Sequence, residues 1–529
     1  MKTKRQILHV FPWTVPFLLL AATAIAQLVD KTMAPNAANE GINKSYVQEI
    51  GAGRGDVMTP DSSAFIISRD PFRAIRRGRQ LFQRKFQKVQ GVGPIVGDGM
   101  GDVGSDLRIG AGLADSCASC HGRPRGAAGF GGDVATRPDS RDSTHLFGLG
   151  LKEMLSDEIT HDLRDIRTKA IMEAQTSGKS VTKQLISKNI HYGSITANPD
   201  GTLDTSKVDG VNVDLRVRPF FSEGKTISIR EFVDGALQAE MGMQAVDPDL
   251  ANAANNHQTI TTPSGMVLDG AEDQIEAPAT ADPNADLDND GVVNEVPESI
   301  VDYLEFYLLN YFKPAQLKQT QTVNKGRKVF EEIGCASCHI PDLMINHDRR
   351  VGDVNTEYDS KNGVFNRLFA TAQTLNDNID DGSGFPALKP PHGGSFLVKD
   401  IYTDFKRHDL GPNFHERNYD GSTQQKFMTR ALWGVGSTSP YGHDGRSINL
   451  TEVILRHEGE ARTARDQFKS LPRNQRSAVL EFLDSLVLFP PDDTASNLNP
   501  ADPTVPGFPQ FGHGNIKLTV LFNDPSDVE

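Results

Sequence analysis

Two copies of one pentapeptide, Cys-Ala-Ser-Cys-His, constrain this chain more than any other feature of its sequence. They span residues 117–121 and 335–339, and together they contain all four cysteines among the 529 residues. A cysteine pair followed at once by a histidine, repeated letter for letter, indicates that both copies perform the same chemistry. The chain therefore has to fold so that it presents two such sites.

Cys-x-x-Cys-His is the attachment signature of c-type haem. The two thiols add to the vinyl groups of the porphyrin, and the histidine reaches back to ligate the iron. A four-cysteine zinc site and disulfide bonds are the alternatives, but neither accounts for a histidine directly after each pair. We therefore predict two covalently bound c-type haems as cofactors. Their predicted binding residues are Cys117, Cys120, His121, Cys335, Cys338 and His339.

The N-terminus has the composition of a secretory signal peptide. Basic residues within the first five positions precede an apolar run that ends in the small-residue pattern Ala24-Ile25-Ala26. A membrane anchor is the alternative, but Pro12 and Pro16 interrupt the run. No later stretch approaches the roughly 20 apolar residues that span a bilayer. We expect cleavage after residue 26, no membrane span in the mature chain, and a location in the periplasm.

The chain is acidic, with a formal net charge of −14 at pH 7. The signal peptide carries three basic residues and no acidic ones, so its removal takes the net charge from −14 to −17. Such a surface argues against binding to nucleic acid or to anionic membranes, and it is compatible with a basic electron-donor protein.

An internal repeat indicates two related domains. The pattern Gly-Arg-polar-aliphatic-Phe occurs at 78–82 and at 326–330, each time N-terminal to a CASCH pentapeptide. Apolar residues at helical spacing predict a helix around each copy. A repeat this long suits two domains rather than a solenoid. The predicted fold class is mainly α, with two cytochrome c-like haem domains, long loops and little β structure.

Composition predicts the domain boundaries. Residues 255–294 are rich in Asp, Asn, Pro and Thr with little periodicity, which indicates a linker, and apolar spacing predicts a helix over 299–312 that leads into the second domain. The predicted organisation is a signal peptide (1–26), an N-terminal extension (27–70), a first haem domain (71–254), a linker with a possible calcium loop (255–298), a second haem domain (299–490) and a C-terminal tail (491–529).

One loop in this linker carries a calcium-binding pattern. Asp286, Asp288 and Asp290 precede a glycine at the spacing of an EF-hand loop. Position twelve, where a glutamate is expected, is Pro297, and Glu298 comes one residue late. A calcium ion and a simple acidic turn are the two interpretations of this loop.

Longer stretches of the sequence resemble a known group, the bacterial di-haem cytochrome c peroxidase superfamily. The resemblance is strongest to its di-haem oxidoreductase branch, also labelled thiol oxidoreductases. It rests on SCASCHGRPRG, ALQAEMGMQ, VNKGRKVFEEIGCASCH, IYTDFKRHDLG and ALWGVGSTSPYGHDGRSINLTEVILRHEGEA. It covers most of residues 72–489, and the N-terminal extension and the tail lie outside it.

The resemblance implies a sixth ligand for the iron of the second haem. In the peroxidases this ligand, usually methionine, follows fourteen residues after the histidine of a T-x-P-Y-x-H-D-G stretch. Here that histidine is His443, and position fourteen is His457. The second haem is therefore expected to be ligated by His339 and His457, with a lower reduction potential than a methionine-ligated haem. His443 is expected to orient groups near this haem.

The same plan requires an open face on the first haem. The loop from Gly122 to Asp142 offers neither the histidine nor the methionine that would close it. His145 and Met154 are the nearest alternative ligands in the sequence.

The resemblance also implies an acid-base catalyst. In the superfamily this carboxylate lies in a helix of the form A-x-x-x-E-M, and Glu240 occupies that place in ALQAEM. A solvated surface glutamate is the alternative. The tryptophan that the superfamily places between its haems is missing, because the equivalent position is Asp157 and the mature chain has only Trp433.

A calcium ion between the haems is a further expectation from the resemblance. Its matching residues are Asp142, Thr438 and Pro440, the last two through their backbone carbonyls.

The function that the resemblance implies is an exported di-haem peroxidase. Its second domain would accept electrons from a small cytochrome c or a cupredoxin and relay them to the first domain, where hydrogen peroxide is reduced. Two alternatives stay open: a di-haem enzyme that oxidises a protein or an organic substrate, and a non-catalytic electron-transfer cytochrome.

Overall fold

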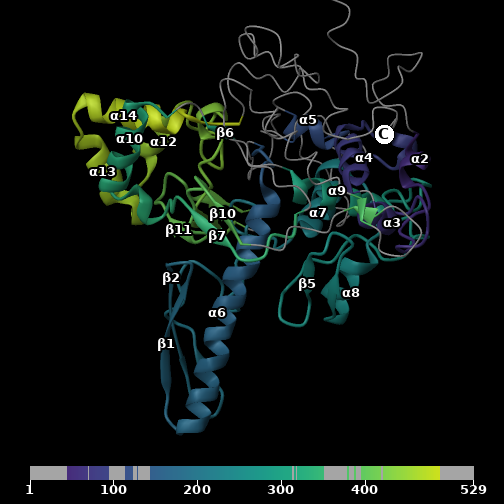
Figure 1. Cartoon of the computed structure of the whole chain (residues 1–529), viewed down its shortest axis with the longest axis horizontal. Coiled ribbons are helices and arrows are strands. Elements are labelled where there is room, and N and C mark those ends of the chain that lie inside the picture. The colour runs from purple at the N-terminus through teal and green to yellow at the C-terminus, as the bar shows by residue number, and fades with distance from the viewer. Residues whose placement is uncertain are drawn as a thin grey trace, which may run out of the picture.

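The computed structural model describes a mostly helical chain with short strands. Two groups of helices flank one long helix, which projects away from both groups (Figure 1). None of the helices in the described part of the chain is long and apolar enough to cross a membrane. The predicted signal peptide, the whole of the predicted tail and Asp142 lie outside the described residues. The described residues are 45–69, 71–93, 114–122, 128, 143–311, 315–316, 319–350, 378–379, 387–388, 395–418 and 421–488.

The N-terminal group of helices packs around α9 (Glu298–Asn310), which is buried along nearly its whole length. α4 (Pro71–Gln83) crosses α9 at Gly78, where a Cβ would lie 2.2 Å from the carbonyl oxygen of Tyr303. A side chain there would force the two helices apart, so the crossing requires glycine. The other helices of this group are α2 (Tyr46–Ile50), α3 (Ser63–Arg69), α5 (Cys117–His121), α7 (Ile229–Met241) and α8 (Pro248–Asn256), with the short 3₁₀ segment η2 (Lys88–Gln90).

The C-terminal group is built on a second helix pair of the same kind. α10 (Gln321–Glu332) crosses α14 (Arg473–Asp484) at Gly326, where a Cβ would lie 1.9 Å from the carbonyl oxygen of Ala478. Phe330 packs edge-on against Phe482, with ring centroids 5.5 Å apart. The remaining elements are α12 (Leu450–Arg456), α13 (Arg462–Ser470) and the 3₁₀ segments η3 (Cys335–Ser337), η4 (Val435–Ser437) and η5 (Gly459–Ala461).

These two crossings explain the internal repeat, and they place α9 differently from our expectation. The repeated glycines, Gly78 and Gly326, make the two helix crossings, and the repeated Phe82 and Phe330 are both buried. α9 therefore packs on α4 in the same way as α14 packs on α10. We expected the helix over 299–312 to open the second domain, whereas it completes the core of the first. α9 is buried on nearly all sides by the N-terminal helices, and its buried Asp302 and Glu305 pair with Arg230 of α7.

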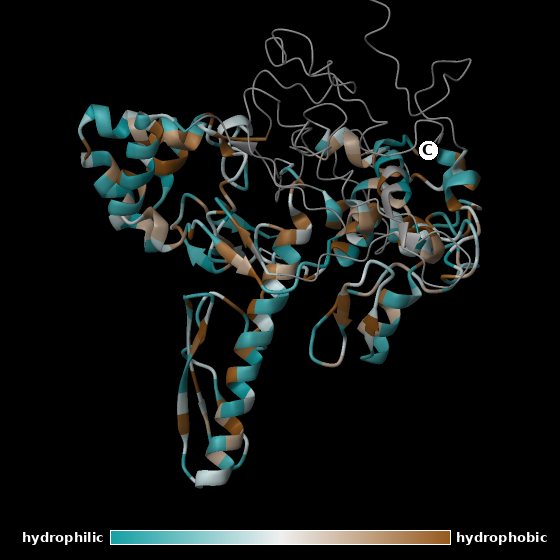
Figure 2. Ribbon diagram, viewed as in Figure 1, coloured by the Kyte–Doolittle hydropathy of each residue, from teal (hydrophilic) through white to brown (hydrophobic). Residues whose placement is uncertain are grey.

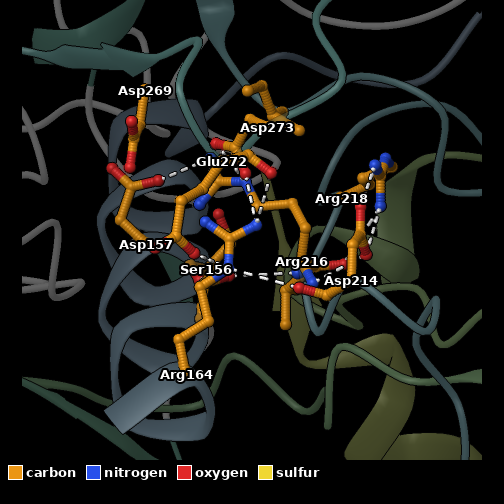
Figure 3. A network of polar contacts seen from close by, with 12 residues as sticks. Ser156, Asp157, Arg164, Asp214, Arg216, Arg218, Asp269, Glu272 and Asp273 are labelled. Atoms are coloured by element: carbon orange, nitrogen blue, oxygen red, sulfur yellow. Dashed lines mark hydrogen bonds and ion pairs between the residues drawn. The ribbon is translucent and has the colours of Figure 1, made fainter. Parts of the chain in front are cut away.

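The predicted linker over 255–298 is a folded part of the N-terminal unit. β4 (Thr259–Thr261) and β5 (Val267–Asp269) form a hairpin beside α8, and Asp247 donates its backbone N–H to the carbonyl of Thr280 at 3.1 Å. The charges of this stretch pair with basic residues, as between Asp273 and Arg164 at 2.6 Å (Figure 3). Its polar composition therefore reflects ion pairs within the fold.

The long helix α6 (Leu149–Ser177) carries the largest sheet. At 1.5 Å per residue its 29 residues extend for roughly 44 Å. β1 (Val181–Ser187), β2 (Ile190–Ala197) and β3 (Leu203–Asp204) form an antiparallel sheet beside its outer half (Figure 1). Lys188 and Asn189 make the two-residue turn, with φ of 48° and 64°. The outer half of α6 is mainly hydrophilic (Figure 2), and the sequence had not led us to expect this projection.

The other strands pair two by two. β11 (Arg407–Asp409) pairs with β14 (Lys426–Met428), and β7 (Leu343–Ile345) pairs with β10 (Phe396–Val398), all antiparallel. The remaining pairs are β12 (Glu416–Arg417) with β13 (Thr423–Gln424), β15 (Leu486–Val487) with β6 (Ala315–Gln316), and β8 (Asn378–Ile379) with β9 (Ala387–Leu388). The expectation of a mainly α chain with little β structure is confirmed for the described residues.

A buried cluster of charges fixes α7 against α9. Arg230 on α7 is fully buried and contacts Asp302 at 2.8 Å, Glu305 at 3.1 Å and Asp247 at 2.5 Å. A buried arginine with three carboxylates on two other elements is geometrically demanding, because each lost partner leaves a buried charge uncompensated. The cluster therefore determines the position of α7.

Asp234 on α7 is a further buried carboxyl group near this cluster. Its side chain is buried, and neither carboxylate oxygen finds a hydrogen-bond donor among the described residues. Burial, and next the negative charge of Asp247, raise the pKa of Asp234 well above its usual value. A pKa raised by folding gives stability below the ordinary aspartate pKa, near 4, and that stability is lost as the pH rises through the folded value.

We expect Asp234→Asn to stabilise the fold at pH 8. The free energy of unfolding should rise by about 1–3 kcal/mol, because asparagine does not ionise and each unit by which folding raises the pKa of Asp234 corresponds to about 1.4 kcal/mol. Urea unfolding between pH 5 and pH 9 measures this effect, and the gain should shrink toward pH 5. Asp165→Asn on the exposed part of α6 is the control. A destabilised Asp234→Asn variant at pH 8 would contradict this assignment.

Candidate haem-binding sites

The first pentapeptide forms a helical turn that presents its histidine. α5 begins after Ser116, whose hydroxyl accepts the backbone N–H of Ser119 at 3.1 Å. Nδ1 of His121 lies 2.7 Å from the carbonyl oxygen of Thr144. A carbonyl can only accept, so the proton is on Nδ1 and the lone pair is on Nε2. Metal-bound histidines are held in this tautomer by the same kind of hydrogen bond.

The second pentapeptide repeats this arrangement in the C-terminal group. Cys335 begins the short 3₁₀ segment η3, and the backbone N–H of His339 donates to the carbonyl of Cys335 at 3.0 Å. Nδ1 of His339 donates to the carbonyl of Tyr402 at 3.0 Å. Its Nε2 therefore also carries a lone pair. Phe330, from the repeated pattern, lies beside this imidazole at 6.1 Å between ring centroids.

His457, the expected sixth ligand of the second haem, is held in the same tautomer. It follows α12, and its Nδ1 donates to the carbonyl of Val453 at 2.7 Å. Desolvation, with the nearby His339 and Arg456, lowers the pKa of His457 to about 4, despite the bond to Val453. A low pKa keeps the imidazole neutral, which is the form that ligates iron. The influence of His339 on this pKa places the two rings near each other.

The cysteines do not form either of the alternative sites. None of the four is in a disulfide bond. Among the described residues, the only metal-like group that includes a cysteine contains Cys338, Asp404 and His408. The four sulfurs therefore do not gather as a four-cysteine zinc site requires.

His408 lies beside the second pentapeptide, and its sequence had suggested no more than haem packing. Its Nε2 contacts Asp404 at 2.9 Å, and its Nδ1 contacts Glu460 at 2.6 Å. Burial alone would lower the pKa of His408, but hydrogen bonds to Asp404 and Cys338 raise it to about 11. This doubly paired imidazole next to Cys338 is a structural link between η3 and η5.

Glu240 lies near the end of α7, next to the segment that precedes the first pentapeptide. Ala114, three residues before Cys117, donates its backbone N–H to the carbonyl of Glu240 at 3.1 Å. Gly93 makes the equivalent bond to Met241 at 3.2 Å. The side chain of Glu240 is partly exposed. The fold thus brings the predicted acid-base residue close to the first CASCH, although 119 residues separate Glu240 from His121.

The two alternative ligands for the first haem have other partners. The sulfur of Met154, buried on α6, accepts the backbone N–H of Arg349 at 3.3 Å. Nε2 of His145 donates to the carbonyl of Trp433 at 3.0 Å. Most of the loop between Gly122 and Asp142 lies outside the described residues, so the open face of the first haem stays a prediction.

Trp433 lies between the two pentapeptide regions. It is buried in the large N-terminal core, although its sequence belongs to the C-terminal half. His145 donates to the carbonyl of Trp433, and the preceding residue, Thr144, accepts from His121. The backbone N–H of the neighbouring Leu432 donates to the carbonyl of Ile401, and the next residue, Tyr402, accepts from His339.

His443 and the T-x-P-Y-x-H-D-G stretch form a closed turn before α12. Nε2 of His443 contacts Glu416 at 3.0 Å, and its ring stacks on Phe427 with centroids 3.9 Å apart. Asp444 pairs with Arg456 at 2.7 Å, which fixes the turn to the helix that ends at His457. Thr438 and Pro440, the expected calcium carbonyls, lie at the start of this turn. Their expected partner Asp142 is outside the described residues.

The predicted calcium loop brings its three aspartates together. One carboxylate oxygen from each of Asp286, Asp288 and Asp290 lies within 4.8 Å of the others. Glu298, the late glutamate, pairs instead with Arg54. Glu295 is the nearby buried acid: desolvation raises its pKa to about 8, and the charges of Asp288 and Asp290 add to this effect. Calcium in this loop stays a prediction.

Part of the C-terminal half matches a family model. Residues 391–486 match the di-haem oxidoreductases. The family description reads "Di-haem oxidoreductase, putative peroxidase". The matched segment carries Trp433, His443 and His457, and both CASCH pentapeptides lie outside it. No curated protein matches the sequence.

Two solved structures share a distant likeness with the chain. Hydrazine synthase of Kuenenia stuttgartiensis, pressurised with 20 bar of xenon, is 12% identical; the match covers 82% of this chain and 95% of that chain, with a TM-score of 0.31. A MauG-like protein associated with microbial copper homeostasis is 13% identical; the match covers 78% of this chain and 88% of that chain, with a TM-score of 0.27. At these TM-scores neither likeness bears on function.

Proposed function

We propose that this chain is an exported di-haem c-type cytochrome that reduces hydrogen peroxide in the periplasm. One observation carries the proposal: His121, His339 and His457 each donate Nδ1–H to a backbone carbonyl and direct the lone pair to Nε2. Two of these histidines complete a Cys-x-x-Cys-His motif, and the third lies near His339. This donor set fits two c-type haems, of which the second has imidazole on both faces.

The chain's own residues would divide the work as follows. His121, His339 and His457 would ligate the two irons, which supply the one-electron chemistry. Each of the two units built on a helix pair would then hold one c-type haem, as a cytochrome c-like domain does. The open face of the first haem would be the place where peroxide binds, which leaves Glu240 as the group that moves protons.

Glu240 would act as general base and then as general acid. It would take the proton from the oxygen of peroxide that binds at the first site and return it to the other oxygen, which leaves as water. Together with two electrons and two protons from outside, one peroxide yields two water molecules. Such positioned proton transfer contributes about 10²- to 10⁴-fold to a rate.

Electrons would reach the first site from the second through the segment around Trp433. His121 and His339 are joined by a short series of hydrogen bonds and adjacent residues. This series replaces the missing tryptophan of the superfamily with one from the C-terminal half. It runs through Thr144, His145, Trp433, Leu432, Ile401 and Tyr402.

Breaking this series should slow electron transfer between the haems several-fold. His145→Phe removes the hydrogen bond to Trp433 and keeps an aromatic ring in the buried site. The rate at which the first haem is reduced after rapid reduction of the second, followed by stopped-flow absorption, measures the effect. His161→Phe on the exposed face of α6 is the control. An unchanged rate in His145→Phe would rule out this route.

The proposed electron donor is a small cytochrome c or a cupredoxin, and the acidic net charge suits a basic partner. We retain Asp142, Thr438 and Pro440, and separately Asp286, Asp288 and Asp290, as proposed calcium ligands. Carboxylate and carbonyl oxygens are the donors that calcium prefers.

Low-temperature EPR of the oxidised protein tests the proposed function. We expect one low-spin ferric signal from the second haem and one high-spin signal from the first, and peroxide should change the high-spin signal. Two low-spin signals that do not change on addition of peroxide would instead indicate an electron-transfer cytochrome. A peroxide response without turnover of peroxide by a reduced donor would favour a di-haem enzyme that oxidises a protein or an organic substrate.

A further inference from the structure

Between the two pentapeptide regions lies a buried group of nitrogen atoms with too few partners. Lys152 on α6 is buried, and its Nζ lies 5.8 Å from the centroid of the Trp433 ring. The indole Nε1 of Trp433 and Nδ1 of His145 are both buried without a hydrogen-bond partner in the described part of the chain. Lys152 likewise has no ion-pair or hydrogen-bond partner there. Three polar groups thus meet in one buried region.

The charges that shift the pKa of Lys152 and of His145 are positive. Burial lowers the pKa of Lys152 to about 7, and the positive charge of Arg430 lowers it further in the same direction. Burial also lowers the pKa of His145, with contributions from Lys152, Arg430 and His121. Arg430 comes from the C-terminal half, and its Nη2 donates to the hydroxyl of Ser222 in the N-terminal half at 2.7 Å.

A buried ammonium without an anion is costly, and among the described residues only the face of the Trp433 ring offsets part of this cost for Lys152. Without a compensating charge such a group loses its proton more readily, and the lowered pKa of Lys152 has this cause. An indole N–H left without an acceptor adds to this cost. The region therefore has the donors and the charge of a site for a carboxylate, and the described residues do not provide that carboxylate.

The place of this region suggests where the carboxylate comes from. His145 follows Thr144, whose carbonyl holds His121, and His145 bonds to Trp433. The backbone of Arg430 lies near His339 and influences its pKa. The group thus lies close to both histidines that complete the CASCH motifs. A c-type haem carries two propionate side chains, each ending in a carboxylate.

We propose that Lys152, Arg430 and the Trp433 indole N–H bind a propionate carboxylate of a covalently held haem. This inference rests on the proposed function, since it requires that haems are attached. His145 Nδ1 becomes a further donor when it takes up a proton beside that carboxylate. The site joins α6 of the N-terminal unit to the Arg430–Trp433 segment of the C-terminal half, so that haem attachment fastens the two halves together.

Lys152→Met tests this site in the full-length holoprotein. Methionine keeps most of the length of the side chain and removes its positive charge. The propionate is then less neutralised, and its negative charge stabilises the ferric state. We expect one haem midpoint potential to fall by the equivalent of about a tenfold change in the ferric-to-ferrous ratio, roughly 59 mV for one electron. Lys152→Arg should restore the potential. Lys169→Met, on the exposed part of the same helix, is the matched control.

The possible outcomes separate the proposals. A protein without covalent haem contradicts the proposed function, whereas two attached haems with unchanged potentials in Lys152→Met contradict only the propionate site. Titration of wild-type holoprotein with acetate tests the other source of a carboxylate: a saturable change of the Soret band, lost in Lys152→Met, would show a site open to free anions and overturn the proposal. If Lys152→Met does not yield holoprotein, Arg430→Gln is the second variant, with the same expected fall in potential.

Discussion

Glu240→Gln should lower the turnover of hydrogen peroxide by about 10²- to 10⁴-fold and leave the absorption spectra of both haems unchanged. Glutamine has almost the same size as glutamate but neither takes nor gives a proton under these conditions. Because Ala114 bonds to the backbone carbonyl of Glu240, the substitution leaves this backbone hydrogen bond intact. Steady-state peroxide consumption with a reduced donor measures the effect.

The control for this substitution makes the same chemical change far from the site. Glu173→Gln lies on the exposed outer part of α6, where Glu173 pairs with Lys183. Its turnover should equal that of the wild type. If Glu240→Gln also turns over peroxide at the wild-type rate, Glu240 has no part in the chemistry and the acid-base residue lies elsewhere.

His457→Met should raise the midpoint potential of one haem by on the order of 0.1 V, well within the range of about 0.8 V over which axial ligands set haem potentials. Methionine ligation raises the potential because a thioether stabilises the ferric state less than imidazole does. His457 is the residue to change, since its Nδ1–H bond and its low pKa hold the ring ready to ligate. Potentiometric titration of both haems gives the measurement.

A histidine without a role in ligation provides the comparison. His161→Met on the exposed face of α6 should shift neither potential. Two unchanged potentials in His457→Met would show that His457 does not ligate the second iron. A changed potential together with a change from low-spin to high-spin iron would mean that methionine does not bind, and the ligand role of His457 would still stand.

The sequence predicted the parts of this molecule that depend on local pattern. The two CASCH motifs, the helices that precede them and the repeated glycines were all legible, because helix period and motif spacing are local properties. The structure adds the reason for the repeat, since Gly78 and Gly326 allow two helix crossings that side chains would block.

Features that depend on distant partners could not be predicted in this way. α9 reads as a helix from its sequence, but nothing local says that its partner is α4, more than two hundred residues earlier, and not α10. The stretch 255–298 reads as a linker because its charges look solvated. The structure pairs them with α6, as Asp273 does with Arg164, and so makes the stretch part of the core unit.

The candidate site shows the same limit. His121 and His339 were identified from their motif, yet the carbonyls that fix their tautomers come from Thr144 and Tyr402, which no motif marks. Trp433 was noted in the sequence as the only tryptophan of the mature chain. Its contact with His145, 288 positions away, is what makes it a bridge between the two pentapeptide regions.

The number of haems that remain attached after denaturation tests the central claim most directly. The protein is produced in a host that matures c-type cytochromes, unfolded, and assayed by its pyridine haemochrome spectrum against protein concentration. Thioether attachment at both pentapeptides predicts two haems per chain that survive unfolding. One haem per chain, or none, would contradict the account.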